Sequence, residues 1–193
     1  MKTIITILSI FSFGIFSFTA SQLPAGTQTE RLRSIYLSQL GVREATNRND
    51  GPQVEAYLCY VGLKPGNPWC AAYVSWCLGQ AGIANPRSGY CPQFFPSSKV
   101  VWKKELKVES VKLKGGKPRQ ATDLPRTGDV FGLYFPEKGR IAHVGFIDEW
   151  GEKYAITCEG NTNEAGSREG DGVYRKRRLI TSIYKVARYL SAQ

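Results

Sequence analysis

Residues 68–76 of this 193-residue chain read Pro68-Trp69-Cys70-Ala71-Ala72-Tyr73-Val74-Ser75-Trp76. Proline suits the first position of a helix, because its φ angle is already helical and its missing N–H would have no partner there. The apolar positions that follow have a helical period as far as Gly82, a glycine that predicts the helix end. We therefore expect Cys70 in the first turn of a helix, where free backbone N–H groups and the helix dipole stabilise a thiolate.

A buried cysteine is also an ordinary core residue, so this position alone does not establish a nucleophile. The chain contains a single histidine, His143, on a strand-like run that precedes the polar turn Glu159-Gly160-Asn161. A cysteine at a helix start and a histidine on a later strand are typical of papain-like thiol enzymes.

The surrounding pattern predicts one α+β domain. Before Cys70, Thr27 and Glu30 form a capping-box signature, and Pro52 opens a second apolar helix that Gly62 closes. A short helix, capped by Ser97 or Ser98, is expected to run through residues 100–102. From Gly128 onward the apolar period changes to two, which predicts strands at residues 130–135, 141–148, 153–159, 173–179 and 183–190. We expect a papain-like arrangement, with the N-terminal helices packed on a C-terminal antiparallel sheet of about five strands.

Residues 1–21 differ from the rest of the chain. Lys2 is followed by an uncharged, mostly apolar run from residue 4 to residue 18 and by small residues that suit cleavage. This pattern is typical of a signal peptide and predicts an exported domain at residues 22–193, with no stable membrane insertion once the signal is removed.

The net charge indicates the kind of partner to expect, and the number of cysteines indicates whether a free thiol is present. The net charge of +10 favours an anionic partner; the chain lacks nucleic-acid-binding signatures, and an anionic cell-wall polymer fits this charge equally well. Residues 99–119 carry eight Lys or Arg against two Glu and form either a polymer-binding patch or a solvated edge. Five cysteines are an odd number, which predicts at least one free thiol, and the other four form two disulfides or none.

The register between the second and third strands decides which side chain meets the histidine. Alternation places His143 on one face with Ile141, Gly145 and Ile147. If His143 pairs with Glu159, the two side chains lie together, whereas pairing with Cys158 puts Glu159 on the opposite face. Glu159 on the histidine's face would orient the imidazole, and elsewhere it would be a surface carboxylate.

The motifs resemble those of the CHAP family (cysteine, histidine-dependent amidohydrolases/peptidases) in the papain-like NlpC superfamily. The resemblance covers about residues 30–190 and rests on four stretches in the family's order: Asn67 to Trp76, Thr127-Gly128-Asp129-Val130, Ile141 to Ile147, and Glu159-Gly160-Asn161. It implies a hydrolase that cleaves amide bonds of bacterial peptidoglycan, either between sugar and stem peptide or within the peptide.

The resemblance also implies roles for single residues. Cys70 is the expected nucleophile, His143 the base and then the acid, and Glu159 the residue that orients the imidazole. Asn161 is a second polar support, and the Cys70 N–H would bind the oxyanion. Trp69 either lines the substrate cleft or is a core aromatic.

No cofactor and no metal are expected, because one histidine without a close cysteine pair makes a poor zinc site. Two alternatives remain open. One is a non-catalytic wall-binding module of the same fold, and the other is an enzyme of the same mechanism that acts on a protein or on a competitor's wall.

Overall fold

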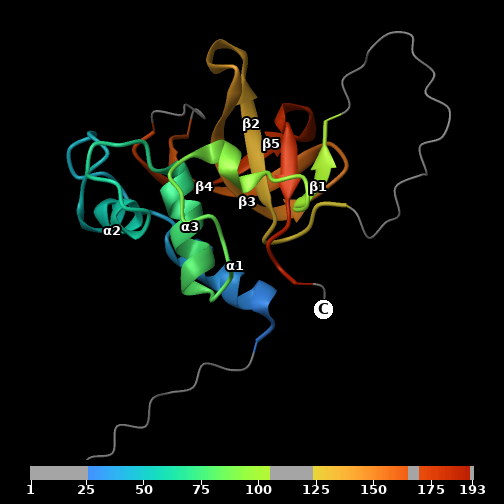
Figure 1. Cartoon of the computed structure of the whole chain (residues 1–193), viewed down its shortest axis with the longest axis horizontal. Coiled ribbons are helices and arrows are strands. Elements are labelled where there is room, and N and C mark those ends of the chain that lie inside the picture. Colours follow the sequence, from blue (N-terminus) through green and yellow to red (C-terminus); the bar gives the residue numbers. More distant parts are fainter. Residues whose placement is uncertain (1–25, 105–123, 165–169, 192–193) are drawn as a thin grey trace, which may run out of the picture.

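The computed structural model describes residues 26–104, 124–164 and 170–191. These residues form an α+β arrangement in which three α-helices lie on one side of a six-stranded antiparallel sheet (Figure 1). The predicted fold class is confirmed at this level, with one strand more than expected. The predicted signal peptide and residues 105–119 of the lysine-rich stretch lie outside the described residues.

The helices form where local sequence favours them. Helix α1 (Gln28–Ser38) follows the predicted capping box: the Thr27 hydroxyl accepts from the Glu30 N–H, and the Glu30 carboxylate accepts from the Thr27 N–H. Helix α2 (Pro52–Tyr60) has its proline at the first position, and helix α3 (Cys70–Gln80) ends before Gly82, whose φ is +72°.

The strand order is β1-β6-β2-β3-β4-β5, and each neighbouring pair is antiparallel. Strands β2 to β5 form a meander, as the period of two predicts. The strand bounds are β1 (Val100–Lys103), β2 (Val130–Phe135), β3 (Arg140–Trp150), β4 (Tyr154–Thr162), β5 (Gly172–Leu179) and β6 (Lys185–Ala187).

Two predicted elements are wrong in detail. Residues 100–102 form part of edge strand β1 rather than a helix, because a run of two valines and a tryptophan suits a strand and β6 offers it a pairing partner. Strand β6 is much shorter than residues 183–190. Its ladder with β2 ends at Ala187 because the partner Val130 is the first residue of β2, directly after a turn at Asp129 and left-handed Gly128.

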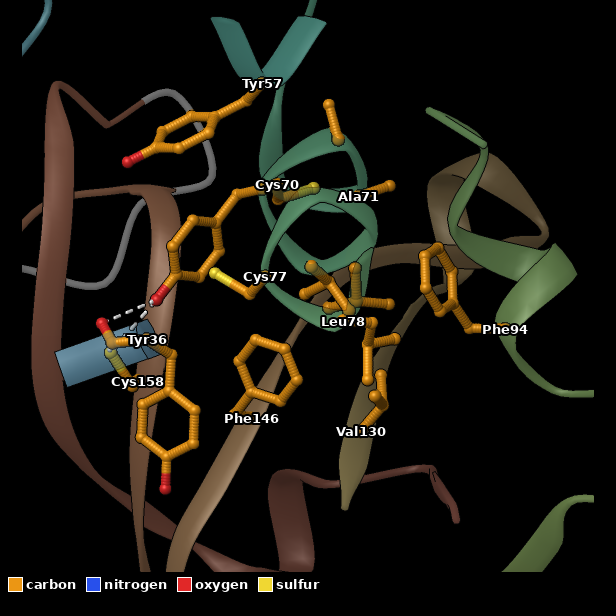
Figure 2. Packing of buried hydrophobic residues seen from close by; sticks show 14 of the residues in the cluster. Tyr36, Tyr57, Cys70, Ala71, Cys77, Leu78, Phe94, Val130, Phe146 and Cys158 are labelled. Atoms are coloured by element: carbon orange, nitrogen blue, oxygen red, sulfur yellow. Dashed lines mark hydrogen bonds between the residues drawn. The ribbon is translucent and has the colours of Figure 1, made fainter. Parts of the chain in front are cut away.

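The main core lies between the helices and the sheet. Figure 2 shows Cys77 and Leu78 of α3 facing Phe146 and Cys158 of the sheet. The rings of Tyr36 and Phe146 stack with their centroids 4.9 Å apart, which joins α1 to β3. This packing fixes α3, and therefore its first residue, against the middle of the sheet.

Candidate active site

Cys70 is the first residue of α3, and Trp69 is the cap residue before it. Cys70 therefore lies in the first helical turn, as predicted, although Pro68 precedes the helix rather than opening it. The cause is local: the backbone of Trp69 is not helical (φ −122°, ψ 7°), and its N–H donates instead to the side-chain oxygen of Asn161 at 3.0 Å.

The start of α3 packs directly onto strand β4. A side chain at Gly160 would place its Cβ 2.6 Å from the Trp69 ring and 2.8 Å from Cγ of Tyr73. Because glycine has no side chain at this contact, the helix can approach the sheet closely, and Cys70 lies next to the strand that carries Glu159.

A β-bulge turns His143 on strand β3. Leu133 pairs with His143 and the next residue, Tyr134, pairs with Ile141, so that Ala142 is the extra residue of the bulge. Bulges redirect side chains and are frequent beside active sites. The predicted alternation fails on this side of His143, because Ile141 joins the same core cluster as Val144.

Strand β3 pairs with β4 in a register that differs from both predicted ones. Phe146 lies opposite Cys158, and continuation of this register places Glu159 opposite Gly145, two residues from His143 on the same face. A Cβ at Gly145 would lie 2.9 Å from Cγ of Glu159. The missing side chain at Gly145 therefore gives Glu159 room to reach His143.

Glu159 is fully buried and hydrogen-bonded on both carboxylate oxygens. His143 Nε2 lies 2.8 Å from Oε2, and the guanidinium of Arg178 binds both oxygens at 2.5 Å. The Thr157 hydroxyl donates to Oε1 at 2.5 Å. Glu159 is thus an interior partner of His143 and not a surface carboxylate.

The charges of the site favour an ion pair between Cys70 and His143. Burial lowers the pKa of His143, but interactions with Cys70 and Glu159 outweigh it and raise this pKa to about 9. A hydrogen bond from Cys91 lowers the pKa of the Cys70 thiol well below its usual range, against the effect of burial, and His143 adds to this shift. Burial disfavours the Glu159 carboxylate, yet His143 and Arg178 lower its pKa to about 2.

The orientation of the imidazole follows from these contacts. Nε2 is bound to Glu159, and buried Nδ1 has no hydrogen-bond partner among the residues that the structure describes. Because Nε2 is taken by Glu159 and Cys70 also interacts with the ring, Nδ1 is the nitrogen left available to the Cys70 sulfur. A thiolate beside an imidazolium held by a carboxylate is the arrangement of an activated cysteine nucleophile.

Asn161 supports the helix start rather than the imidazole. Its side-chain oxygen accepts from the Trp69 N–H, and its amide donates to Asn49 and to the carbonyl of Gly170. Its φ of 55° lies in the left-handed region, which asparagine tolerates better than most residues. Asn161 therefore ties β4 to the backbone that carries the nucleophile.

Of the two interpretations of Trp69, the structure supports the core aromatic. Its side chain is fully buried, its ring stacks on Tyr57, and its Nε1–H donates to Glu44 at 2.8 Å. The expectation that Trp69 lines the cleft is wrong, because Gly160 lets β4 cover the ring.

Cys70 lines a cleft of about 920 Å³, and most of the side chains that line this cleft are polar. The lining includes Glu44, Asn161, Cys91 and Arg140, whose guanidinium covers the ring of Tyr90. The lining thus combines acidic and basic side chains with the thiol.

Sequence reasoning missed three residues of this site: Cys91, Arg178 and Glu44. Glu44 lies in a loop and Cys91 begins a 3₁₀ helix of four residues, and neither segment has a periodicity that could signal its role. Arg178 was one of four consecutive cations, Arg175-Lys176-Arg177-Arg178, and alternation predicts that only half of them face inward.

Comparison of the chain with protein-family models and with curated proteins gave no match. In the part of the chain that the structure describes, no group of three or more His, Cys, Asp or Glu side chains is placed to hold a metal ion. Among the same residues, none of the helices has the length and apolar character needed to span a membrane.

Proposed function

We propose that this chain is an exported cysteine hydrolase of the CHAP family, with a papain-like fold, that cleaves amide bonds of bacterial peptidoglycan. The observation that carries the proposal is the position of Cys70 at the start of α3, where its thiol interacts with an imidazole whose Nε2 lies 2.8 Å from Glu159, and this interaction lowers the pKa of the thiol. The predicted signal peptide and the basic charge support a target outside the cytoplasm.

The geometry supports a two-step mechanism. The Cys70 thiolate attacks the amide carbonyl carbon, and the free N–H groups of the first helical turn, that of Cys70 included, stabilise the oxyanion. The His143 imidazolium then donates its Nδ1 proton to the leaving amine, which leaves a thioacyl enzyme. Neutral His143 takes a proton from water, the resulting hydroxide attacks the thioacyl carbon, and the Cys70 thiolate departs.

The cleft supports a polar substrate that carries both charges. Glu44 accepts hydrogen bonds from Trp69 Nε1 and from the Asn49 N–H, both neutral donors, so its charge is available to a cationic group. Arg140, which lines the same cleft, suits a carboxylate. Stem peptides of peptidoglycan contain amines and carboxylates within a few residues, which matches this arrangement.

The test is digestion of purified sacculi by the chain and by Cys70→Ala, with Cys59→Ser as the control because Cys59 is an exposed thiol. We expect soluble fragments from the unaltered chain and from Cys59→Ser only, and mass spectrometry of the new termini will name the bond. Digestion by Cys70→Ala would refute the proposal. Binding to sacculi without release of fragments would favour the wall-binding module.

A further inference from the structure

A second thiol lies against the candidate nucleophile. The Sγ atoms of Cys70 and Cys91 are 3.6 Å apart, although 21 residues separate them in the sequence. Cys91 begins the short 3₁₀ helix η1 (Cys91–Phe94), and both cysteines line the same cleft. All five cysteines of the chain are free, and this is the pair whose sulfur atoms are in contact.

The two thiols differ in ionisation. Cys91 donates to the sulfur of Cys70, and this hydrogen bond raises the pKa of Cys91 well above its usual range, whereas the pKa of Cys70 is lowered. At neutral pH the pair is therefore one thiolate and one thiol. Oxidants react with the thiolate, and a neighbouring thiol can then resolve the product.

We propose that Cys70 and Cys91 form a reversible oxidation site that responds to peroxides. The Cys70 thiolate attacks one peroxide oxygen, the O–O bond breaks, and hydroxide leaves, which gives a sulfenic acid at Cys70. The sulfur of Cys91 then attacks the Cys70 sulfur, the S–O bond breaks, and the hydroxyl departs as water with the Cys91 proton. The two sulfur atoms lose two electrons in total, and the peroxide gains them.

The geometry allows the second step. A disulfide needs an S–S distance of about 2.05 Å, so the sulfurs approach by about 1.5 Å, a shift within the reach of side-chain rotation. Oxidation also removes the thiolate that accepts the hydrogen bond from Cys91, and this bond is the main cause that raises the pKa of Cys91, while nearby Arg140 favours the Cys91 thiolate. Oxidation of Cys70 therefore activates Cys91 for the resolving step.

The disulfide would block the nucleophile and protect it from further oxidation. None of the other three cysteines combines a lowered thiol pKa with a second thiol in contact. Cys77 and Cys158 are fully buried, and burial raises the pKa of both thiols, so they react slowly. Cys59 is exposed and serves as an internal reference for a simple surface thiol.

The experiment exposes the chain, Cys91→Ser and Cys59→Ser to hydrogen peroxide, and then treats half of each sample with dithiothreitol. Peptide mass spectrometry under non-reducing conditions, with fragmentation, locates the modified cysteines without reference to any enzymatic activity. Serine at position 91 keeps a hydrogen-bond donor beside Cys70 but cannot form the disulfide, so it isolates the resolving role of Cys91.

We expect a Cys70–Cys91 disulfide, with loss of two hydrogen atoms, in the unaltered chain and in Cys59→Ser, and return of the alkylatable Cys70 thiol after dithiothreitol. In Cys91→Ser we expect sulfinic acid at Cys70 and loss of that recovery. Direct conversion of Cys70 to sulfinic acid in the unaltered chain would overturn the proposal. So would equal recovery of the Cys70 thiol in Cys91→Ser.

Discussion

Arg178 on β5 holds Glu159 on β4 through two parallel hydrogen bonds, with Nε 2.5 Å from Oε1 and Nη2 2.5 Å from Oε2. The second of these oxygens also binds His143 Nε2. Glu159 is fully buried, so its charge needs a permanent cation as well as an imidazole that titrates. Arg178 helps to keep the carboxylate ionised and holds both of its oxygens in place beside His143.

We therefore predict that Arg178→Ala lowers the free energy of unfolding by about 3 to 5 kcal/mol, because it leaves a buried carboxylate without its cation. Arg178→Lys should recover part of this loss, since an ammonium restores the charge but not the two-point contact. Urea denaturation of the three proteins measures the differences.

The matched control for this prediction is Arg177→Ala. Arg177 is the exposed neighbour on the same strand, and its guanidinium lies over the ring of Tyr154. Its removal should cost less than about 1 kcal/mol. Equal losses for Arg177→Ala and Arg178→Ala would show that Arg178 is not needed to neutralise Glu159.

The residues that sequence could predict are those with a local signature. Cys70 follows from the proline and the helical period around it, and His143 follows from its place on an apolar strand as the only imidazole. The sequence predicts Glu159 as a candidate, but it does not predict the contact of Glu159 with His143, because that contact depends on the register between β3 and β4. Both predicted registers were wrong because the pairing of Phe146 with Cys158 is set by core packing, which no local pattern encodes.

The bulge at Ala142 and the thiol at Cys91 show the same limit. Alternation alone contains no sign of an extra residue, yet the bulge changes which face Ile141 occupies. Cys91 reaches Cys70 through a proline-rich loop whose path depends on how it packs on the body. Local chemistry thus predicts the parts of this site, and tertiary packing decides which of them meet.

The carboxylate also sets the pH range of the candidate nucleophile. Deprotonation of His143, whose pKa is raised to about 9, removes the imidazolium, so solubilisation of sacculi should fall as the pH rises through about 9. Glu159→Gln removes one of the charges that raise this pKa. We therefore predict that the alkaline limb of the pH–rate profile moves to lower pH in this variant.

Glu149→Gln is the control for this shift, because Glu149 is a carboxylate with a 62% exposed side chain on the neighbouring strand. Its profile should match that of the unaltered chain. Circular dichroism establishes that Glu159→Gln is folded before the profiles are compared. An unchanged alkaline limb in folded Glu159→Gln would contradict the electrostatic role of Glu159.

Gly145 gives a steric test of the same contact. In Gly145→Ala the new Cβ would lie 2.8 Å from the carbonyl oxygen of Cys158 and 2.9 Å from Cγ of Glu159. Both distances are shorter than the closest contacts that Cβ atoms normally make. We predict a loss of about 1 to 3 kcal/mol in the free energy of unfolding and a slower alkylation of Cys70 at neutral pH. Chemical denaturation and the rate of iodoacetamide labelling measure the two effects. Unaltered labelling would show that Glu159 keeps its position despite the added methyl group.

Asn161 allows backbone strain to be separated from hydrogen bonding. Both Asn161→Ala and Asn161→Gly remove the acceptor of the buried Trp69 N–H, which should cost about 1 to 3 kcal/mol. Only alanine also places a Cβ at a φ of 55°, so Asn161→Ala should be less stable than Asn161→Gly by about 1 kcal/mol more. Thermal and urea unfolding of the two variants measure this difference directly. The same hydrogen bond fixes the residue before Cys70, so iodoacetamide should alkylate Cys70 more slowly in both variants than in the unaltered chain. Equal stability of the two variants would mean that position 161 leaves the left-handed region when asparagine is removed.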